Sequence, residues 1–168
     1  MVTFKKSFML LILFPTFLFA EDSGALFFNE VTLNLEGAKE VARRVEVASK
    51  KLNKTVSLAV VGASGETLLI YKGDGVGPHN SEAARRKAFT SLSTKNATLE
   101  LMQKAASHND TKNLANLPEL LLLSGGVPLW HKGVVIGAVG VAGGGSPEND
   151  DFIARAAAVT EKEITTKN

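Results

Sequence analysis

The chain has 168 residues, a formal net charge of +2 and no cysteine, and this length suits one domain with a substantial core. The absence of cysteine excludes disulfides, thiolate metal sites and a cysteine nucleophile. Two of the lysines, Lys5 and Lys6, lie at the very start, so the rest of the chain is close to neutral and nucleic-acid binding through a basic surface is not expected.

Residues 1–20 have the layout of a secretory signal peptide. Two lysines precede an almost continuous apolar run over residues 8–19, which ends in the small residue Ala20. The run holds about a dozen apolar residues and contains Pro15, whereas a membrane-spanning helix needs about 20. We predict a cleaved signal over residues 1–20, a flexible leader over residues 21–30, and a periplasmic or secreted protein without a membrane span; retention as an anchor is the alternative.

The first half of the domain is predicted to hold a helix and a hairpin. Apolar residues recur at helical spacing over residues 35–52, and Asn34 is a suitable N-cap. Residues 55–61 and 66–71 are rich in β-branched and apolar types, and the turn-forming residues 62–65 separate them. This pattern is typical of two antiparallel strands joined by a tight turn.

The middle of the chain is predicted to be a loop followed by helices. Residues 72–78 contain three glycines and a proline, which indicates an irregular loop. A second helix is expected over residues 81–91 and a third over residues 99–106, and the polar residues 108–116 are expected to form a long loop.

Three strands and a final helix are predicted for the last third. The strands are expected at residues 120–123, 128–131 and 134–141, and Ser146 is expected to cap a helix that ends at about residue 165. Neighbouring strands joined by tight turns favour an antiparallel sheet with helices packed against it. The fold class is therefore α+β and not a doubly wound parallel sheet.

The residues that carry chemistry gather around the glycine-rich loop and the helix that follows it. Histidine is the usual protein ligand of haem iron, and tyrosine is a variant ligand. Arginine and lysine would bind the propionates through charge-assisted hydrogen bonds. The alternative is a solvated basic helix face with Asp74 paired locally, which the residue types alone favour. The candidates are Tyr71, Asp74, His79, Arg85, Arg86 and Lys87. His131, beside Trp130 at a hairpin tip, is expected to be a surface histidine.

A series of short motifs follows the order found in a known family: these motifs lie at residues 34–38, 63–65, 74–75, 86–90, 125–129, 133–141 and 146–150. The chain resembles the GlcG/HbpS family, which includes the C-terminal domain of PduO-type cobalamin adenosyltransferases. The resemblance implies a profilin-like antiparallel sheet of about five strands flanked by helices over residues 31–168, assembly into homo-oligomers, and haem binding.

The resemblance also ranks the candidate iron ligands. Residues 77–79 resemble a subgroup pattern that places a histidine directly before the second helix, so His79 is the first choice of metal ligand, ahead of His131 and Tyr71. The leading hypothesis is an exported haem-binding protein in haem or iron handling or redox sensing. The alternative is a periplasmic accessory protein of an oxidation pathway that binds a hydroxy acid through Asp74 and the basic helix. A haem-degrading enzyme is a third hypothesis, although the sequence shows no independent set of residues suited to general acid–base catalysis.

Overall fold

The computed structural model describes residue 26 and residues 28–167. The predicted signal over residues 1–20 lies outside the described residues, as does most of the predicted leader. Residues 28–34 form neither helix nor strand, and Phe28 is 82% exposed. In this described part of the chain, no helix combines the length and the apolar character needed to span a membrane.

The centre of the fold is a five-stranded sheet with the order β2-β1-β4-β3-β5, in which all neighbouring strands are antiparallel. β1 and β2 form the predicted hairpin, and β3 and β4 form a second hairpin that turns at Lys132 and Gly133. β2 is therefore an edge strand, which matters for the site below. The strands are β1 Ser57–Gly62, β2 Thr67–Tyr71, β3 Gly126–His131, β4 Val134–Ala142 and β5 Ile164–Thr165.

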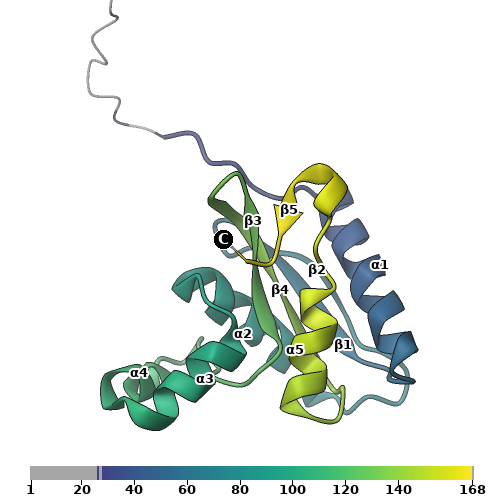
Figure 1. Ribbon diagram of the computed structural model, residues 1–168, viewed down its shortest axis with the longest axis vertical. Helices are drawn as coiled ribbons and strands as arrows, with labels where there is room; N and C mark the ends of the chain where they lie inside the picture. Colours follow the sequence, from purple (N-terminus) through teal and green to yellow (C-terminus); the bar gives the residue numbers. More distant parts are fainter. Residues whose placement is uncertain (1–25, 27, 168) are drawn as a thin grey trace, which may run out of the picture.

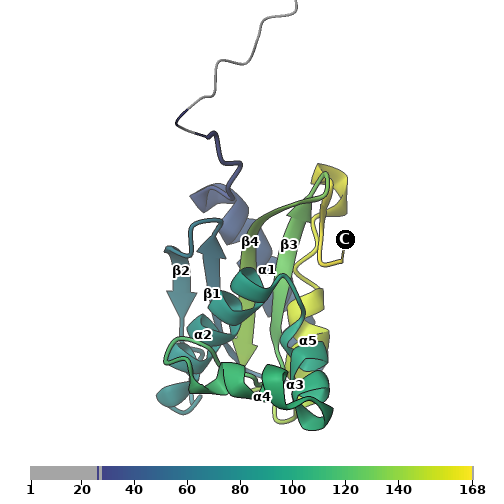
Figure 2. The ribbon, with the colours of Figure 1, turned by 90° about the vertical axis from the view of Figure 1, so that its left-hand side faces the viewer.

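Helices cover both faces of this sheet (Figure 1). α1 and α5 lie on one face, and α2 lies on the other with α3 and α4 beside it, as the turned view in Figure 2 shows from the α2 side. The predicted α+β fold is thus confirmed. The helices are α1 Leu35–Lys51, α2 His79–Thr94, α3 Thr98–Ser107, α4 Asn109–Asn113 and α5 Pro147–Arg155.

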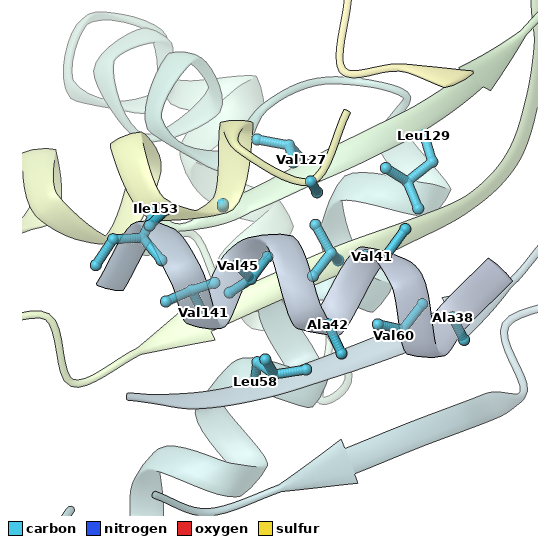
Figure 3. Close-up of a cluster of buried hydrophobic side chains, with 14 of the residues drawn as sticks. Ala38, Val41, Ala42, Val45, Leu58, Val60, Val127, Leu129, Val141 and Ile153 are labelled. Carbon is cyan, nitrogen blue, oxygen red and sulfur yellow. The ribbon is translucent and has the colours of Figure 1, made fainter. Parts of the chain in front are cut away.

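The main core lies between the sheet and α1. α1 has the predicted helical periodicity, so Val41 and Val45 face the sheet. There they pack with Leu58, Val141 and other buried side chains (Figure 3). The helix begins where expected, because the side chain of Asn34 accepts a hydrogen bond from the Gly37 N–H at 2.8 Å. This cluster contains most of the buried apolar side chains, so we expect it to contribute the larger share of the hydrophobic stabilisation.

The opposite face packs more closely because its residues are small. Ala59 of β1, Ala84 of α2 and Ala142 of β4 form a buried cluster. A Cβ at Gly140 would lie 2.0 Å from the Ala84 carbonyl oxygen, so only glycine fits there. Gly140 therefore permits the close approach of α2 to β4.

Two predictions for the second half are wrong. Residues 120–123 are not a strand, because α2 side chains take their backbone hydrogen bonds: the Leu120 carbonyl accepts from Arg86, and the Leu121 N–H donates to Thr90 Oγ1. The last helix, α5, ends at Arg155 and not near residue 165. Beyond it the chain turns through a 3₁₀ segment, Thr160–Lys162, and supplies the fifth strand, β5, beside β3.

Two further predictions need correction in the middle of the chain. The polar residues 108–116 are not a loop but form α4 and a 3₁₀ turn, Leu114–Asn116. α2 begins at His79, directly after Pro78, whereas the sequence placed the start at residue 81. Proline suits the first turn of a helix because it needs no N–H partner there, so His79 belongs to the helix itself.

Candidate functional site

The glycine-rich loop wraps around the free edge of the sheet and joins its two faces. Tyr71 ends β2 and packs against the α1-side core, in register with Leu58. After the loop, His79 begins α2, which covers the opposite face. Tyr71 and His79 therefore lie at the same end of the sheet but on opposite faces.

Tyr71 lies in an open pocket of about 470 Å³. The pocket is formed by the end of α1, the turn into β1 and the start of the glycine-rich loop, with Lys54, Lys72 and Asp74 also in its lining. Burial, assisted by the charge of Glu46, raises the pKa of the Tyr71 hydroxyl to about 12. The hydroxyl is protonated in the neutral range, as in any tyrosine, and burial extends this protonated state to higher pH, so it can donate a hydrogen bond to a ligand.

The lysines of this pocket differ in how they are engaged. Lys50 forms an ion pair with Glu46 at 2.7 Å. The Lys72 ammonium donates to the carbonyl oxygens of Gly73 and Val76 at 3.1 and 3.0 Å. Within residues 28–167, Lys54 has no side-chain hydrogen bond or ion pair. Lys54 was not a candidate from the sequence, because nothing in its local pattern indicates a pocket.

His79 is exposed at the start of α2, and its ring makes no hydrogen bond to another described residue. A Cβ at Gly77 would approach the His79 Cε1 to 3.1 Å, so glycine leaves room for the ring against the loop. An accessible imidazole with free nitrogens is a suitable ligand for a metal or haem iron. Among the described residues, no group of three or more histidine, aspartate or glutamate side chains forms a metal cluster.

The predicted basic residues of α2 do not converge on His79. Arg85 forms ion pairs with Glu82 and Glu119 at 2.7 and 2.8 Å, and these hydrogen bonds raise its pKa. Arg86 donates to the Leu120 carbonyl at 2.6 Å, and its Nε is buried without a partner.

Lys87 points into the protein interior. Its side chain is only 5% exposed, and its ammonium donates to Asp150 Oδ2 at 2.8 Å and to the Val141 carbonyl at 2.9 Å. The other oxygen of Asp150 accepts from the Gly144 N–H at 2.7 Å. Lys87 thus connects α2 with β4 and α5, and its position gives it a structural role.

His131 lies far from the other candidates. It pairs with Val134 at one end of β4, whereas Tyr71 aligns through β1 with Val141 near the other end. The β4 segment from Val134 to Val141 spans about 23 Å. The His131 Nδ1 lies 3.3 Å from the Glu163 carbonyl oxygen, so the half-buried ring is engaged with the turn before β5.

A second open hollow of about 540 Å³ lies at the hairpin end of the sheet. Phe89 and Trp130 line it, with Leu92 and Val135 nearby, but its lining includes neither a histidine nor a tyrosine. The residues around it therefore offer apolar contact without an ordinary ligand for haem iron.

Comparison with known proteins identifies the family. The family model described as "Haem degrading protein HbpS-like" matches residues 33–159. The chain belongs to this HbpS-like family. It is 33% identical over 129 residues to an uncharacterised 15.0 kDa protein from the dhaT-dhaS intergenic region of Citrobacter freundii, covering 75% of the chain and 89% of that protein.

Other HbpS-like relatives are parts of longer proteins. The corrinoid adenosyltransferase PduO of Citrobacter freundii is 27% identical over 131 residues, which is 76% of this chain but only 38% of PduO. The chain therefore spans well under half of that relative.

Solved structures agree with the fold. A double mutant of HbpS from Streptomyces reticuli is 38% identical with a TM-score of 0.75, covering 82% of this chain and 92% of that one. A PduOC:haem complex is 26% identical with a TM-score of 0.72, covering 82% of this chain and all of that one, 100%. The family and fold expected from the sequence are both confirmed.

Proposed function

We propose that this HbpS-like protein is an exported haem-binding protein, in haem or iron handling or redox sensing, with His79 as the iron ligand. The observation that carries the proposal is the exposed His79 imidazole, free of partners among the described residues, at the start of α2. The family description and the haem complex of the related PduOC support haem as the bound group. When bound, haem would supply the redox-active iron.

The geometry favours His79 over the other candidate ligands. The raised pKa of Tyr71 opposes formation of the phenolate that would bind ferric iron. His131 is engaged with the Glu163 carbonyl at the far end of the sheet. His79 needs neither deprotonation against burial nor the loss of an existing hydrogen bond.

The three basic residues of α2 are all engaged with protein groups, and Arg86 is the one that shares a helix face with His79. It follows His79 by two helical turns on the same side of α2, about 10 Å along the axis. Lys87 is held by Asp150 and would leave an uncompensated buried charge if it moved. We therefore assign no propionate contact to Lys87, and a contact with Arg86 would replace its hydrogen bond to the Leu120 carbonyl.

Titration of the purified protein with haemin tests the proposal. We expect a saturable shift of the Soret band, and we expect His79→Ala to weaken binding at least about tenfold, since even loss of a residue that supports a ligand costs 10–100-fold. His108→Ala is the matched control, because His108 is also exposed but lies at the junction of α3 and α4. The affinity of His108→Ala for haemin should equal that of the wild type.

Two results would contradict this assignment. Absence of any saturable Soret shift would contradict the proposal that the protein binds haem. Equal affinity of His79→Ala and the wild type would exclude His79 as the ligand, and a loss in His131→Ala instead would transfer the role to His131.

A further inference from the structure

The pocket beside Tyr71 collects hydrogen-bond donors from three separate segments. Lys54 comes from the turn between α1 and β1, Tyr71 from the end of β2, and Lys72 from the glycine-rich loop. The pocket is open to solvent, and its volume of about 470 Å³ lies within the range of small-molecule sites.

Within the lining of this pocket, Lys54 is the cation whose side chain has no partner among the described residues. Its backbone N–H is bonded to the Ser49 carbonyl, which fixes the turn, but its ammonium forms no ion pair. Lys54 is exposed and lines the pocket, and its ammonium also lies near Gly145, outside the lining, where an added Cβ would be 3.3 Å from it. A cation placed in a pocket in this way attracts an anion.

Tyr71 and Lys72 add donors of different kinds. The Tyr71 hydroxyl makes no hydrogen bond to another described residue, and its raised pKa keeps the proton in place. The Lys72 ammonium uses two of its three N–H donors on the Gly73 and Val76 carbonyls, so one remains.

The acids of the lining restrict the negative charge that a ligand can carry. Glu46 is neutralised by Lys50 at 2.7 Å, whereas Asp74 is exposed at the rim with no ion pair to a described residue. Asp74 would repel a second negative group on the ligand. The pocket therefore suits a single carboxylate better than a polyanion.

We propose that this pocket is a carboxylate-binding site in which Lys54, Lys72 and Tyr71 donate to the two carboxylate oxygens. The carboxylate comes either from a free small monocarboxylic acid or from a propionate of haem. The second source rests on the haem-binding function proposed above, and the first does not.

The first arm of the test uses the haem-free protein. Acetate, L-lactate and butyrate share the carboxylate and differ in the remainder, and calorimetric titration measures their binding. We expect saturable binding of at least one, and Lys54→Gln should weaken it about tenfold, the usual effect of losing a charged hydrogen bond. Lys104→Gln is the matched control, because this exposed lysine of α3 lies outside the pocket.

The second arm compares haemin with haemin dimethyl ester, which lacks free carboxylates. If propionate is the source, the wild type binds haemin more tightly than the ester, and Lys54→Gln reduces this preference while Lys104→Gln preserves it. Tyr71→Phe provides a second variant that should weaken whichever carboxylate binds. Thermal unfolding confirms that each variant is folded.

Binding in either arm that depends on Lys54 supports the site. The site is refuted if no acid saturates the haem-free protein and the preference for haemin over the ester is absent or independent of Lys54. Equal losses in Lys54→Gln and Lys104→Gln would also refute it, because they would indicate unspecific attraction. The Soret shift and its dependence on His79 are measured separately, so failure here leaves the haem proposal standing, and the reverse also holds.

Discussion

At the scale of the residue, environment separates side chains that the sequence placed together. Tyr71 and His79 are close in the chain, yet one is half-buried against the α1-side core and the other is exposed at the start of α2. Burial keeps Tyr71 neutral and suits it to donate a hydrogen bond. Exposure leaves His79 free to bind a ligand, so the two residues are suited to different tasks.

The titration of Tyr71 provides a direct test of its environment. Tyr71 is the only tyrosine of the chain, so ultraviolet absorbance reports its ionisation alone. We expect a midpoint near pH 12 in the folded protein, against 10 for the ordinary group, because burial and the charge of Glu46 disfavour the phenolate. A midpoint near 10 below the onset of unfolding would contradict the half-buried position.

The same shift predicts a dependence of stability on pH. Because the folded-state pKa is raised, the contribution of the Tyr71 hydroxyl is fully present below pH 10 and is lost as the pH rises through about 12. Tyr71→Phe cannot ionise at this position. Its thermal midpoint should therefore fall less between pH 10 and 12 than that of the wild type.

At the scale of the element, α2 is fixed to the sheet by close packing and one buried ion pair. Gly140 allows the backbone of α2 to approach β4, and the Lys87–Asp150 pair then crosses from α2 to the start of α5. Asp150 also accepts from the Gly144 N–H, so the pair orders the turn that precedes α5. Lys87 therefore stabilises the helix that carries His79.

Removal of one member of this pair should destabilise the fold strongly. We expect Lys87→Met to lower the free energy of unfolding by about 3–5 kcal/mol, because it leaves Asp150 buried and uncompensated. Urea unfolding followed by the fluorescence of Trp130, the only tryptophan, measures the loss. Lys104→Met, at an exposed position, should stay within about 0.5 kcal/mol of the wild type.

A double variant separates the charge from the packing. Asp150→Asn keeps the oxygen that accepts from Gly144 and removes the buried charge. Combined with Lys87→Met, it should recover part of the lost stability. If the double variant were less stable than Lys87→Met alone, the pair would not be the cause.

At the scale of the whole molecule, the two ends of the sheet have different surroundings. The described leader enters at the hairpin end, where Thr32 Oγ1 accepts from the Ala63 N–H and the Leu33 N–H donates to the Ile136 carbonyl (Figure 1). His79 and the pocket of Tyr71 lie at the opposite end. The predicted cleavage after Ala20 would remove no residue of the candidate site.

Export is tested by the mass of the mature protein. We expect the protein recovered from the periplasm or the medium to begin at Glu21, as cleavage after Ala20 predicts. Ala20→Arg should block cleavage, because signal peptidase needs a small residue there. Intact-mass measurement of each fraction distinguishes the forms, and a full-length protein confined to the cytoplasm would contradict the proposal.

The sequence by itself determined the features that depend on neighbouring residues. The periodicity of α1, the caps at Asn34 and Ser146 and the two hairpins were all predictable, since each is set by local side chains and turn residues. The motif order was also sufficient to identify the family. His79 was a candidate because the sequence places it between the glycine-rich loop and the second helix.

Only the tertiary structure decided the features that depend on partners distant in the chain. Residues 120–123 do not form a strand because side chains of α2 bond to their backbone groups. β5 forms because the outer edge of β3 is available for pairing. Lys87 became structural because Asp150 lies 63 residues away in the sequence but 2.8 Å away in space. Lys54 entered a pocket because three segments meet there, and no local pattern carries that information.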